Sequence, residues 1–220
     1  MKTYVISLEN DFDKRAVLLS QCKELGLEVE LFYAIEGAAL ELSYINRNVD
    51  NYPDCRMTLG VIGCALSHLA IYKKMIDGNL PMALILEDDA RISTRTLEVL
   101  KELETTYNNN ERVYLLTPPE HYCPTKSISV SPHLSFYRVS TACSTAGYVV
   151  TLQAAKKLIN INMPIKWEAD SWAMFSFVHD LEIYCLVPPV IADGDIDKRA
   201  STLEVERAKM RLKEPKFVIN

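Results

Sequence analysis

Residues 82–86 form an unbroken apolar run that ends in three consecutive carboxylates, Glu87, Asp88 and Asp89. A short run of this kind is typical of a central strand in an α/β sheet, where other elements cover both faces. Ligands of parallel sheets bind beyond the carboxyl ends of the strands, so the three carboxylates are expected at a binding site. In extended backbone, Glu87 and Asp89 point to one face and Asp88 points to the other.

The same triplet predicts a divalent cation. Three adjacent carboxylates repel one another, and a bound cation reverses that cost. Oxygen ligands suit Mg²⁺ or Mn²⁺, which bind one or two carboxylates and bridge to substrate phosphates. The alternative interpretation is a solvated acidic turn after a strand, and the triplet alone does not decide between the two.

Apolar periodicity places the other elements. Strands are predicted at residues 4–8, 28–33, 112–117, 134–140, 146–151 and 181–187, and helices from Asp11 or Asp13 to Gly26 and at 58–77, 93–107, 152–160 and 169–179. Residues 36–56 are expected to form an irregular surface loop, and the mixed-charge tail from Lys198 to be helical as far as Lys213. The alternation of strands and helices predicts one α/β domain over residues 1–220, with antiparallel strands added in its later half.

Composition narrows the class of protein. Apolar residues make up 49% and charged residues 24% of the 220 residues, which is typical of a globular domain. The net charge of −5 argues against a nucleic-acid partner, which requires a basic surface. Cys22, Cys64 and Cys185 lie in apolar patterns, where a thiol acts as a small hydrophobe, and C-x-x-C spacing is absent. With no secretory signal and no long apolar run, the sequence predicts a protein of the reducing cytoplasm.

Five sequence segments occur in the order seen in one enzyme family. They are Val5-Ile6-Ser7-Leu8 with Arg15, Phe32–Gly37 (FYAIEG), Gly60–His68 (GVIGCALSH), Leu84–Ala90 (LILEDDA), and Thr145–Val150 (TAGYVV) leading into Ala154–Leu158. Through them the chain resembles glycosyltransferase family 25, the lipooligosaccharide sugar transferases that include bacterial β-1,4-galactosyltransferases. GCALSH followed by LILEDDA is more specific than either segment alone. The chain departs from the family at Tyr33, where aspartate is usual, and at Val61, where an acidic residue is common.

The resemblance implies a fold and a reaction. The fold is the GT-A type of nucleotide-sugar transferases, an α/β fold with a mixed, mostly parallel central sheet flanked by helices. Residues 1–117 would form the nucleotide-binding half, and residues 118–220 the acceptor-side half with the C-terminal tail. The implied reaction is inverting transfer of a sugar, usually galactose from UDP-galactose, to a lipooligosaccharide or related surface glycan.

The resemblance also implies roles for donor-site residues. Asp89 would bind Mn²⁺ or Mg²⁺ on the diphosphate, and Glu87 would reach the ribose or the metal through water. Further donor contacts are implied for Ser7, Leu8, Arg15, Ser67, His68, Asp88 and Thr145. Arg15 could instead pair with a nearby surface aspartate, and His68, on the flank of its helix, could instead complete the core.

An inverting transfer also needs a base for the proton of the acceptor hydroxyl. The resemblance favours Asp170, with Glu168 as the substitute and with Trp167 and Trp172 available to stack on sugars. Asp170 could instead be only a helix cap. A third metal ligand is expected late in the chain, where His179, Asp193 and Asp195 are the candidates.

Two other functions stay open at this stage. One is a metal-dependent nucleotidyltransferase, which would normally need a glycine-rich phosphate loop that residues 1–20 lack. The other is a catalytically weakened nucleotide-sugar-binding protein, which the departures at Tyr33 and Val61 would allow. Basic residues in the tail leave room for peripheral contact with the cytoplasmic face of the inner membrane, but glutamates interrupt them and favour a solvated helix.

Overall fold

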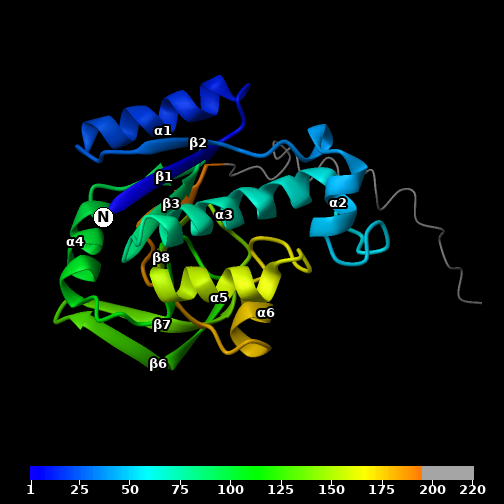
Figure 1. The fold of residues 1–220 in the computed structure, drawn as a ribbon. Coiled ribbons are helices and arrows are strands. Elements are labelled where there is room, and N and C mark those ends of the chain that lie inside the picture. Colours follow the sequence, from blue (N-terminus) through cyan, green and yellow to red (C-terminus); the bar gives the residue numbers. More distant parts are fainter. Residues whose placement is uncertain (195–220) are drawn as a thin grey trace, which may run out of the picture.

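The computed structural model describes residues 1–194, in which one large sheet carries the fold (Figure 1). The strands are β1 Lys2–Ser7, β2 Glu30–Tyr33, β3 Met82–Glu87, β4 Ala90–Ile92, β5 Arg112–Leu115, β6 His121–Ser131, β7 Leu134–Thr141, β8 Gly147–Thr151, β9 Glu182–Leu186 and β10 Ile191–Asp193. The helices are α1 Phe12–Glu24, the 3₁₀ turn η1 Gly37–Ala39, α2 Leu42–Asn48, α3 Leu59–Asp77, α4 Thr96–Thr106, α5 Leu152–Asn162 and α6 Trp172–Phe177.

The eight strands of the main sheet lie in the order β2-β1-β3-β8-β5-β9-β7-β6. The β2, β1 and β3 strands are parallel, β8 runs against its neighbours β3 and β5, and β7 runs against β9 and β6. Six of the eight strands therefore point the same way, because β5 and β9 are also parallel. The predicted fold class, a mixed and mostly parallel sheet flanked by helices, is confirmed.

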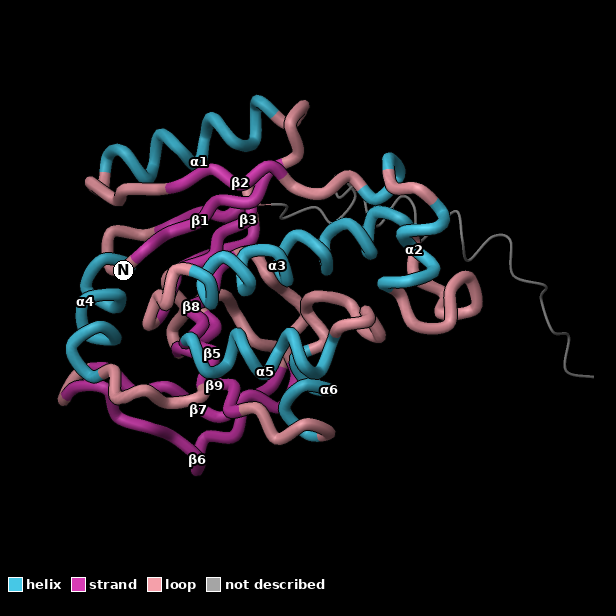
Figure 2. Tube along the Cα trace, in the orientation of Figure 1, coloured by secondary structure: helices cyan, strands magenta, loops and turns pink. Residues whose placement is uncertain are grey.

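Helices cover the sheet on both faces, and alternate strand residues divide between two cores. Ala83 and Ile85 of β3 pack in the core shared with α3, α5 and α6, whereas Leu84 and Leu86 pack in the core shared with α1 and α4. Figure 2 shows α3 and α5 running side by side, with α1 and α4 at the top and left of the view. The apolar run therefore forms a strand buried on both faces, as predicted.

Helix α3 begins and ends where the sequence predicts. The Thr58 hydroxyl accepts a hydrogen bond from the Val61 amide, and the helix ends at Asp77, with Gly78 as its C-cap. Within residues 1–194, α3 also has the length and mean hydropathy of a membrane span. No segment of this kind was predicted from the sequence. However, 61% of that stretch is buried inside the protein, as in the core helix of a globular domain.

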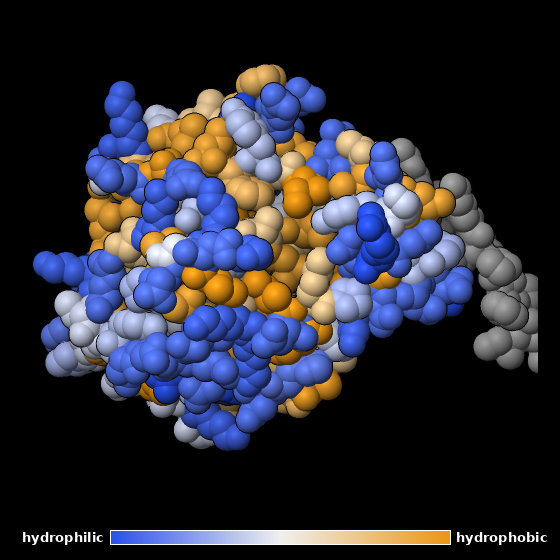
Figure 3. Space-filling model, in the orientation of Figure 1, coloured by the Kyte–Doolittle hydropathy of each residue, from blue (hydrophilic) through white to orange (hydrophobic). Residues whose placement is uncertain are grey.

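Five short or polar elements were not predicted. Residues 36–56 contain η1 and α2 rather than only an irregular loop, and β4 pairs with β10 in a small separate sheet. Strand β6 is the edge strand opposite β2, and most of its side chains are polar and exposed, so it lacks the alternation that marks a half-buried strand. Figure 3 shows hydrophilic residues over the lower part of this face, where β6 and β7 lie. The predicted helix from Lys198 to Lys213 falls outside the described residues.

Candidate active site

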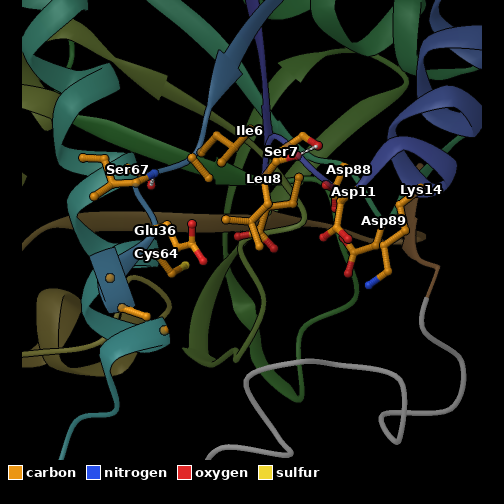
Figure 4. Close-up of a pocket in the computed structure, with 16 residues that line it drawn as sticks. Ile6, Ser7, Leu8, Asp11, Lys14, Glu36, Cys64, Ser67, Asp88 and Asp89 are labelled. Atoms are coloured by element: carbon orange, nitrogen blue, oxygen red, sulfur yellow. Dashed lines mark hydrogen bonds between the residues drawn. The ribbon is translucent and has the colours of Figure 1, made fainter. Parts of the chain in front are cut away.

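A pocket of about 240 Å³ opens at the carboxyl ends of β1 and β3. These two strands are parallel neighbours, with Ile6 opposite Glu87, so the residues that follow them meet at one edge of the sheet. The lining comprises Ile6, Ser7, Leu8, Asp11, Lys14, Ala34, Ile35, Glu36, Gly37, Ala38, Gly60, Cys64, Ser67, Glu87, Asp88 and Asp89. Figure 4 shows Asp11, Lys14, Asp88 and Asp89 on one side of the pocket, with Glu36 and Cys64 on the other. The pocket lies where the triplet predicted a site.

Asp89 has the environment of a cation ligand. Its Oδ1 atom is buried, and no group in residues 1–194 hydrogen-bonds to it. Burial, followed by the negative charges of Glu87, Asp193 and Asp88, raises the pKa of Asp89 to about 7. A carboxylate oxygen that is buried without a donor is costly unless a ligand satisfies it. A divalent cation would satisfy that oxygen and offset the surrounding charge, so the residues present fit Mn²⁺ or Mg²⁺.

The small β4–β10 sheet brings a late aspartate to Asp89. Asp193 lies opposite Ala90 in the antiparallel pair, and the Gly194 amide donates to the Asp89 carbonyl oxygen at 2.8 Å. Asp193 is therefore the one of the three predicted late ligands that the structure places beside the triplet. His179 instead packs its ring against Trp167, 5.0 Å between centroids, and Asp195 lies outside the described residues.

Glu87 is held from behind by a buried network. Its Oε1 accepts from the Thr145 hydroxyl at 2.6 Å and lies 3.1 Å from His68 Nε2. The other ring nitrogen of His68 lies 2.7 Å from the Tyr148 hydroxyl, which lies 2.6 Å from the Tyr72 hydroxyl. Burial alone would raise the pKa of Glu87, but the hydrogen bond and charge of His68 and the bond from Thr145 leave it lowered. Glu87 therefore stays ionised.

His68 and Thr145 consequently have a different position from the one predicted. His68 is only 2% exposed and does not line the pocket, and both of its ring nitrogens have protein partners. Thr145 is also buried and directs its hydroxyl at Glu87. Both residues therefore orient Glu87, and direct contact of either one with a donor stays a prediction.

Arg15 holds the turn that follows β1. It is 8% exposed, and its guanidinium donates to the Ser7 hydroxyl at 3.1 Å and to the Leu8 and Glu9 carbonyl oxygens at 2.9 and 3.2 Å. These three hydrogen bonds fix the turn between β1 and α1, and contact of the remaining Arg15 donors with a phosphate stays a prediction. The alternative of a surface pair with an aspartate is not what the structure shows.

Among the described residues, Lys14 is the basic side chain that lines the pocket, and it was not among the predicted site residues. Its positive charge lowers the pKa of all three carboxylates of the triplet, although burial outweighs it at Asp88 and Asp89. The sequence feature that could have identified Lys14 is its position in the first turn of the helix that follows the first strand. An amine there lies beside the carboxyl end of that strand.

The remaining predicted donor residues do line the pocket. Ser7 bonds to Leu8 and Arg15, and its hydrogen bond to Asp88 partly offsets the burial that raises the pKa of Asp88. Ser67 accepts from the Ile35 amide at 2.8 Å and donates to the Gly63 carbonyl oxygen at 2.7 Å. Ser67 therefore pins the chain after β2 against α3 and shapes that wall of the pocket.

Asp170 and Glu168 lie in a second, more open pocket of about 380 Å³. Its lining also includes Cys143 and Trp172. Trp172 is fully buried, packs against Tyr148, and donates from its indole nitrogen to the Ser144 carbonyl oxygen at 2.9 Å. It is therefore not available to stack on a sugar, in contrast to the prediction. Because Ser144 directly precedes Thr145, the two pockets share one supporting segment.

Comparisons with known proteins agree on one family. The sequence profile of glycosyltransferase family 25, described as an LPS biosynthesis protein family, matches residues 1–173. Human procollagen galactosyltransferase 2 is 28% identical over 177 residues, which cover 72% of this chain but 27% of that protein. A Haemophilus influenzae protein named as a glycosyltransferase is 29% identical over 195 residues, which cover 85% of this chain and 68% of that protein.

A solved structure of a glycosyltransferase involved in glycosylating the major capsid of PBCV-1 is 9% identical. The structural alignment covers 96% of this chain and 100% of that protein, with a TM-score of 0.47. The chain spans about a quarter of the length of the procollagen galactosyltransferases that it matches, 27% in the human protein. Because the family profile matches most of the chain, over a range that includes the pocket residues up to Asp170, the chain belongs to glycosyltransferase family 25.

Proposed function

We propose that this glycosyltransferase moves galactose from UDP-galactose to a lipooligosaccharide or related surface glycan, with inversion and with Mn²⁺ or Mg²⁺. The observation that carries the proposal is the buried Oδ1 of Asp89, which accepts no hydrogen bond from residues 1–194 and lies among the negative charges of Glu87, Asp88 and Asp193. The names of the procollagen galactosyltransferases support galactose, and the family description supports the acceptor class. We further propose a cytoplasmic location, with peripheral contact at the inner membrane where such an acceptor would be presented.

Three residues would hold the metal, namely Asp89, Asp193 and Glu87. The ion would neutralise charge that builds on the departing diphosphate. Lys14 lies among the same carboxylates and would place a further positive charge beside the phosphates. Ser7 and Leu8, at the end of β1, would border the nucleoside.

Asp170 would act as the general base. In the transfer, the acceptor oxygen forms a bond to the anomeric carbon, the bond from that carbon to the diphosphate oxygen breaks, and Asp170 takes the hydroxyl proton. Its open pocket leaves room for an acceptor, and the segment around Ser144 connects that pocket to Glu87. Glu168, on the same wall, is the second carboxylate in reach of an acceptor.

The first experiment measures donor binding. In a thermal shift panel of UDP-sugars with Mn²⁺, UDP-galactose should raise the melting temperature only when Mn²⁺ is present, because a ligand of the folded state stabilises it. Asp89→Asn should lose the shift, whereas Asp77→Asn, an exposed control at the far end of α3, should keep it. A shift of equal size in Asp89→Asn would overturn the metal site.

The second experiment separates binding from chemistry. Asp170→Asn should keep the Mn²⁺-dependent shift and lose at least about 100-fold in transfer, in line with removal of a general base. Glu168→Gln is the matched control and should lose far less. Transfer by Asp170→Asn at the wild-type rate would refute the assignment of the base. Binding without any release of sugar by the wild type would favour the alternative of a weakened binding protein.

A further inference from the structure

Cys64, His68 and Glu87 gather beside the proposed Mn²⁺ site, and each offers one ligand atom of a different element. The thiol sulfur, a ring nitrogen and a carboxylate oxygen all lie within 4.8 Å of one another. We propose that they form a second metal site, for a softer divalent ion of the zinc class, that shares Glu87 with the first site. This inference does not rest on the proposed function, because it concerns different ligand chemistry and holds for a chain without donor.

The ligand set matches zinc rather than manganese. Zn²⁺ binds thiolate sulfur, imidazole nitrogen and carboxylate oxygen together, and sites with three protein ligands leave the fourth position to water or another ligand. Thiolate is a poor partner for Mn²⁺ or Mg²⁺, which prefer oxygen. The triplet supplies only oxygen, so the two places differ in the ion that they favour.

The geometry needs little adjustment. Cys64 and His68 are four residues apart on α3, so their side chains project from one face of the helix. His68 Nε2 and Glu87 Oε1 are already 3.1 Å apart. A tetrahedral zinc ion with bonds of about 2.0 to 2.3 Å holds its ligand atoms roughly 3.3 to 3.6 Å from one another. Only a modest movement of side chains is therefore required, and Cys64 faces the pocket, which gives an ion a route in.

The histidine already has the supporting partner that metal-bound histidines use. His68 Nδ1 lies 2.7 Å from the Tyr148 hydroxyl, and Tyr148 lies 2.6 Å from the Tyr72 hydroxyl. Without an ion, Nε2–H can donate to Glu87 while Nδ1 accepts from Tyr148. With an ion on Nε2, Nδ1–H donates to Tyr148, whose own proton turns toward Tyr72. The hydroxyl pair satisfies both tautomers, so binding leaves no buried nitrogen without a partner.

Sharing Glu87 couples the two sites. An ion held by Cys64 and His68 takes the carboxylate oxygen that now bonds to His68, and it places a second positive charge close to the first. The two ions therefore compete, and we expect zinc to weaken Mn²⁺ binding. Cys64 packs partly against the core, as predicted for a small apolar residue, but unlike the buried Cys22 and Cys185 it also lines the pocket.

The test uses Co²⁺ as a spectroscopic probe of the zinc site, with the full chain kept reduced. Wild-type protein should show a thiolate-to-cobalt charge-transfer band that equimolar Zn²⁺ removes. Cys64→Ser should lose the band, and the matched thiol control Cys123→Ser, on the β6 edge strand, should keep it. A circular dichroism melt of Cys64→Ser confirms that the variant is folded.

Asp89→Asn separates this site from the proposed Mn²⁺ site. It should keep the cobalt band at full intensity while it loses the Mn²⁺-dependent effect of UDP-galactose. Absence of the band in wild-type protein, or an equal band in Cys64→Ser, would overturn the zinc site without touching the proposed function. Loss of the band in Asp89→Asn would also overturn it, because the ion would then belong to the triplet.

Discussion

Lys14 and Arg15 are neighbours in the first turn of α1, yet the fold gives them opposite roles. The Arg15 guanidinium is buried and donates to Ser7, Leu8 and Glu9, whereas Lys14 lines the pocket among the carboxylates. A sequence pattern shows that a basic residue stands near the end of the first strand. It does not show which of two adjacent side chains turns inward, because that depends on the angle at which α1 leaves β1.

This difference predicts how two substitutions separate binding from stability. Arg15→Ala leaves buried acceptors without a donor and should lower the free energy of unfolding by about 2 to 4 kcal/mol. Lys14→Ala should change that free energy by less than about 1 kcal/mol and weaken UDP-galactose binding about tenfold, because it removes a charge beside the phosphates. Urea unfolding and donor titration measure the two effects.

Lys23→Ala, at the exposed end of the same helix, is the control and should change neither quantity. The assignment of roles would be wrong if Arg15→Ala left stability unchanged while it abolished donor binding.

At the scale of elements, the site depends on a close approach between α3 and the chain that follows β2. Gly63 of α3 faces the Ile35 carbonyl oxygen, which an added Cβ would meet at 2.3 Å. Gly37, at the start of η1, faces the Leu59 carbonyl oxygen, which an added Cβ would meet at 1.7 Å. The two glycines let backbone touch backbone and so form one wall of the pocket.

Gly63→Ala should therefore disturb both the wall and the fold. We expect a loss of about 1 to 3 kcal/mol in the free energy of unfolding, typical of overpacking, together with weaker donor binding. Gly78→Ala, at the carboxyl end of the same helix, is the matched control. Its new Cβ would meet nothing closer than 3.2 Å, so it should cost less than about 1 kcal/mol and leave binding unchanged. Equal effects of the two substitutions would contradict the close-approach argument.

The elements that the sequence predicted well are those whose apolar pattern is set by the main cores. The strand at Met82–Leu86 and the helix α3 fall within a residue or two of their predicted bounds, because burial on both faces or along one stripe repeats regularly. The edge strand β6 and the helix α2 escaped prediction, since neither has such a stripe. The β4–β10 pair is set by contacts between residues about a hundred positions apart, which local patterns do not contain.

At the scale of the whole molecule, the site joins two parts of one sheet. Parallel strands β1 and β3 bring the triplet and the residues after β1 to one edge, and antiparallel β8 brings the Thr145 segment back beside β3. The strand order explains why the sequence predicts where the pocket lies but not which side chains contact one another around it. The triplet marks the edge of the sheet, whereas the roles of His68, Thr145 and Asp193 depend on the return of later strands.

This concentration of carboxylates predicts how stability depends on pH. The pKa of Asp89 is raised from 3.8 to about 7, so the folded protein binds that proton more tightly than the unfolded chain does. The native state is therefore favoured by protonation, and stability should fall as pH rises from about 4 to about 7. Glu87 has a lowered pKa, so its ionised form stabilises the folded protein. That contribution is lost only as pH falls below the ordinary glutamate pKa of 4.5, outside the range in which Asp89 acts.

Comparing wild type with Asp89→Asn measures this effect together with its coupling to Glu87, Asp88 and Asp193, because asparagine does not titrate and groups distant from residue 89 cancel. In protein freed of metal by a chelator, the variant should gain about 2 to 3 kcal/mol relative to wild type between pH 5 and pH 8. Saturating Mn²⁺ at pH 8 should reverse the difference, because the ion stabilises only the protein that retains the carboxylate. Urea unfolding at both pH values measures the change. A stability difference between the two proteins that stays constant with pH would mean that the pKa of Asp89 is not raised. The electrostatic argument for a cation at this carboxylate would then fail.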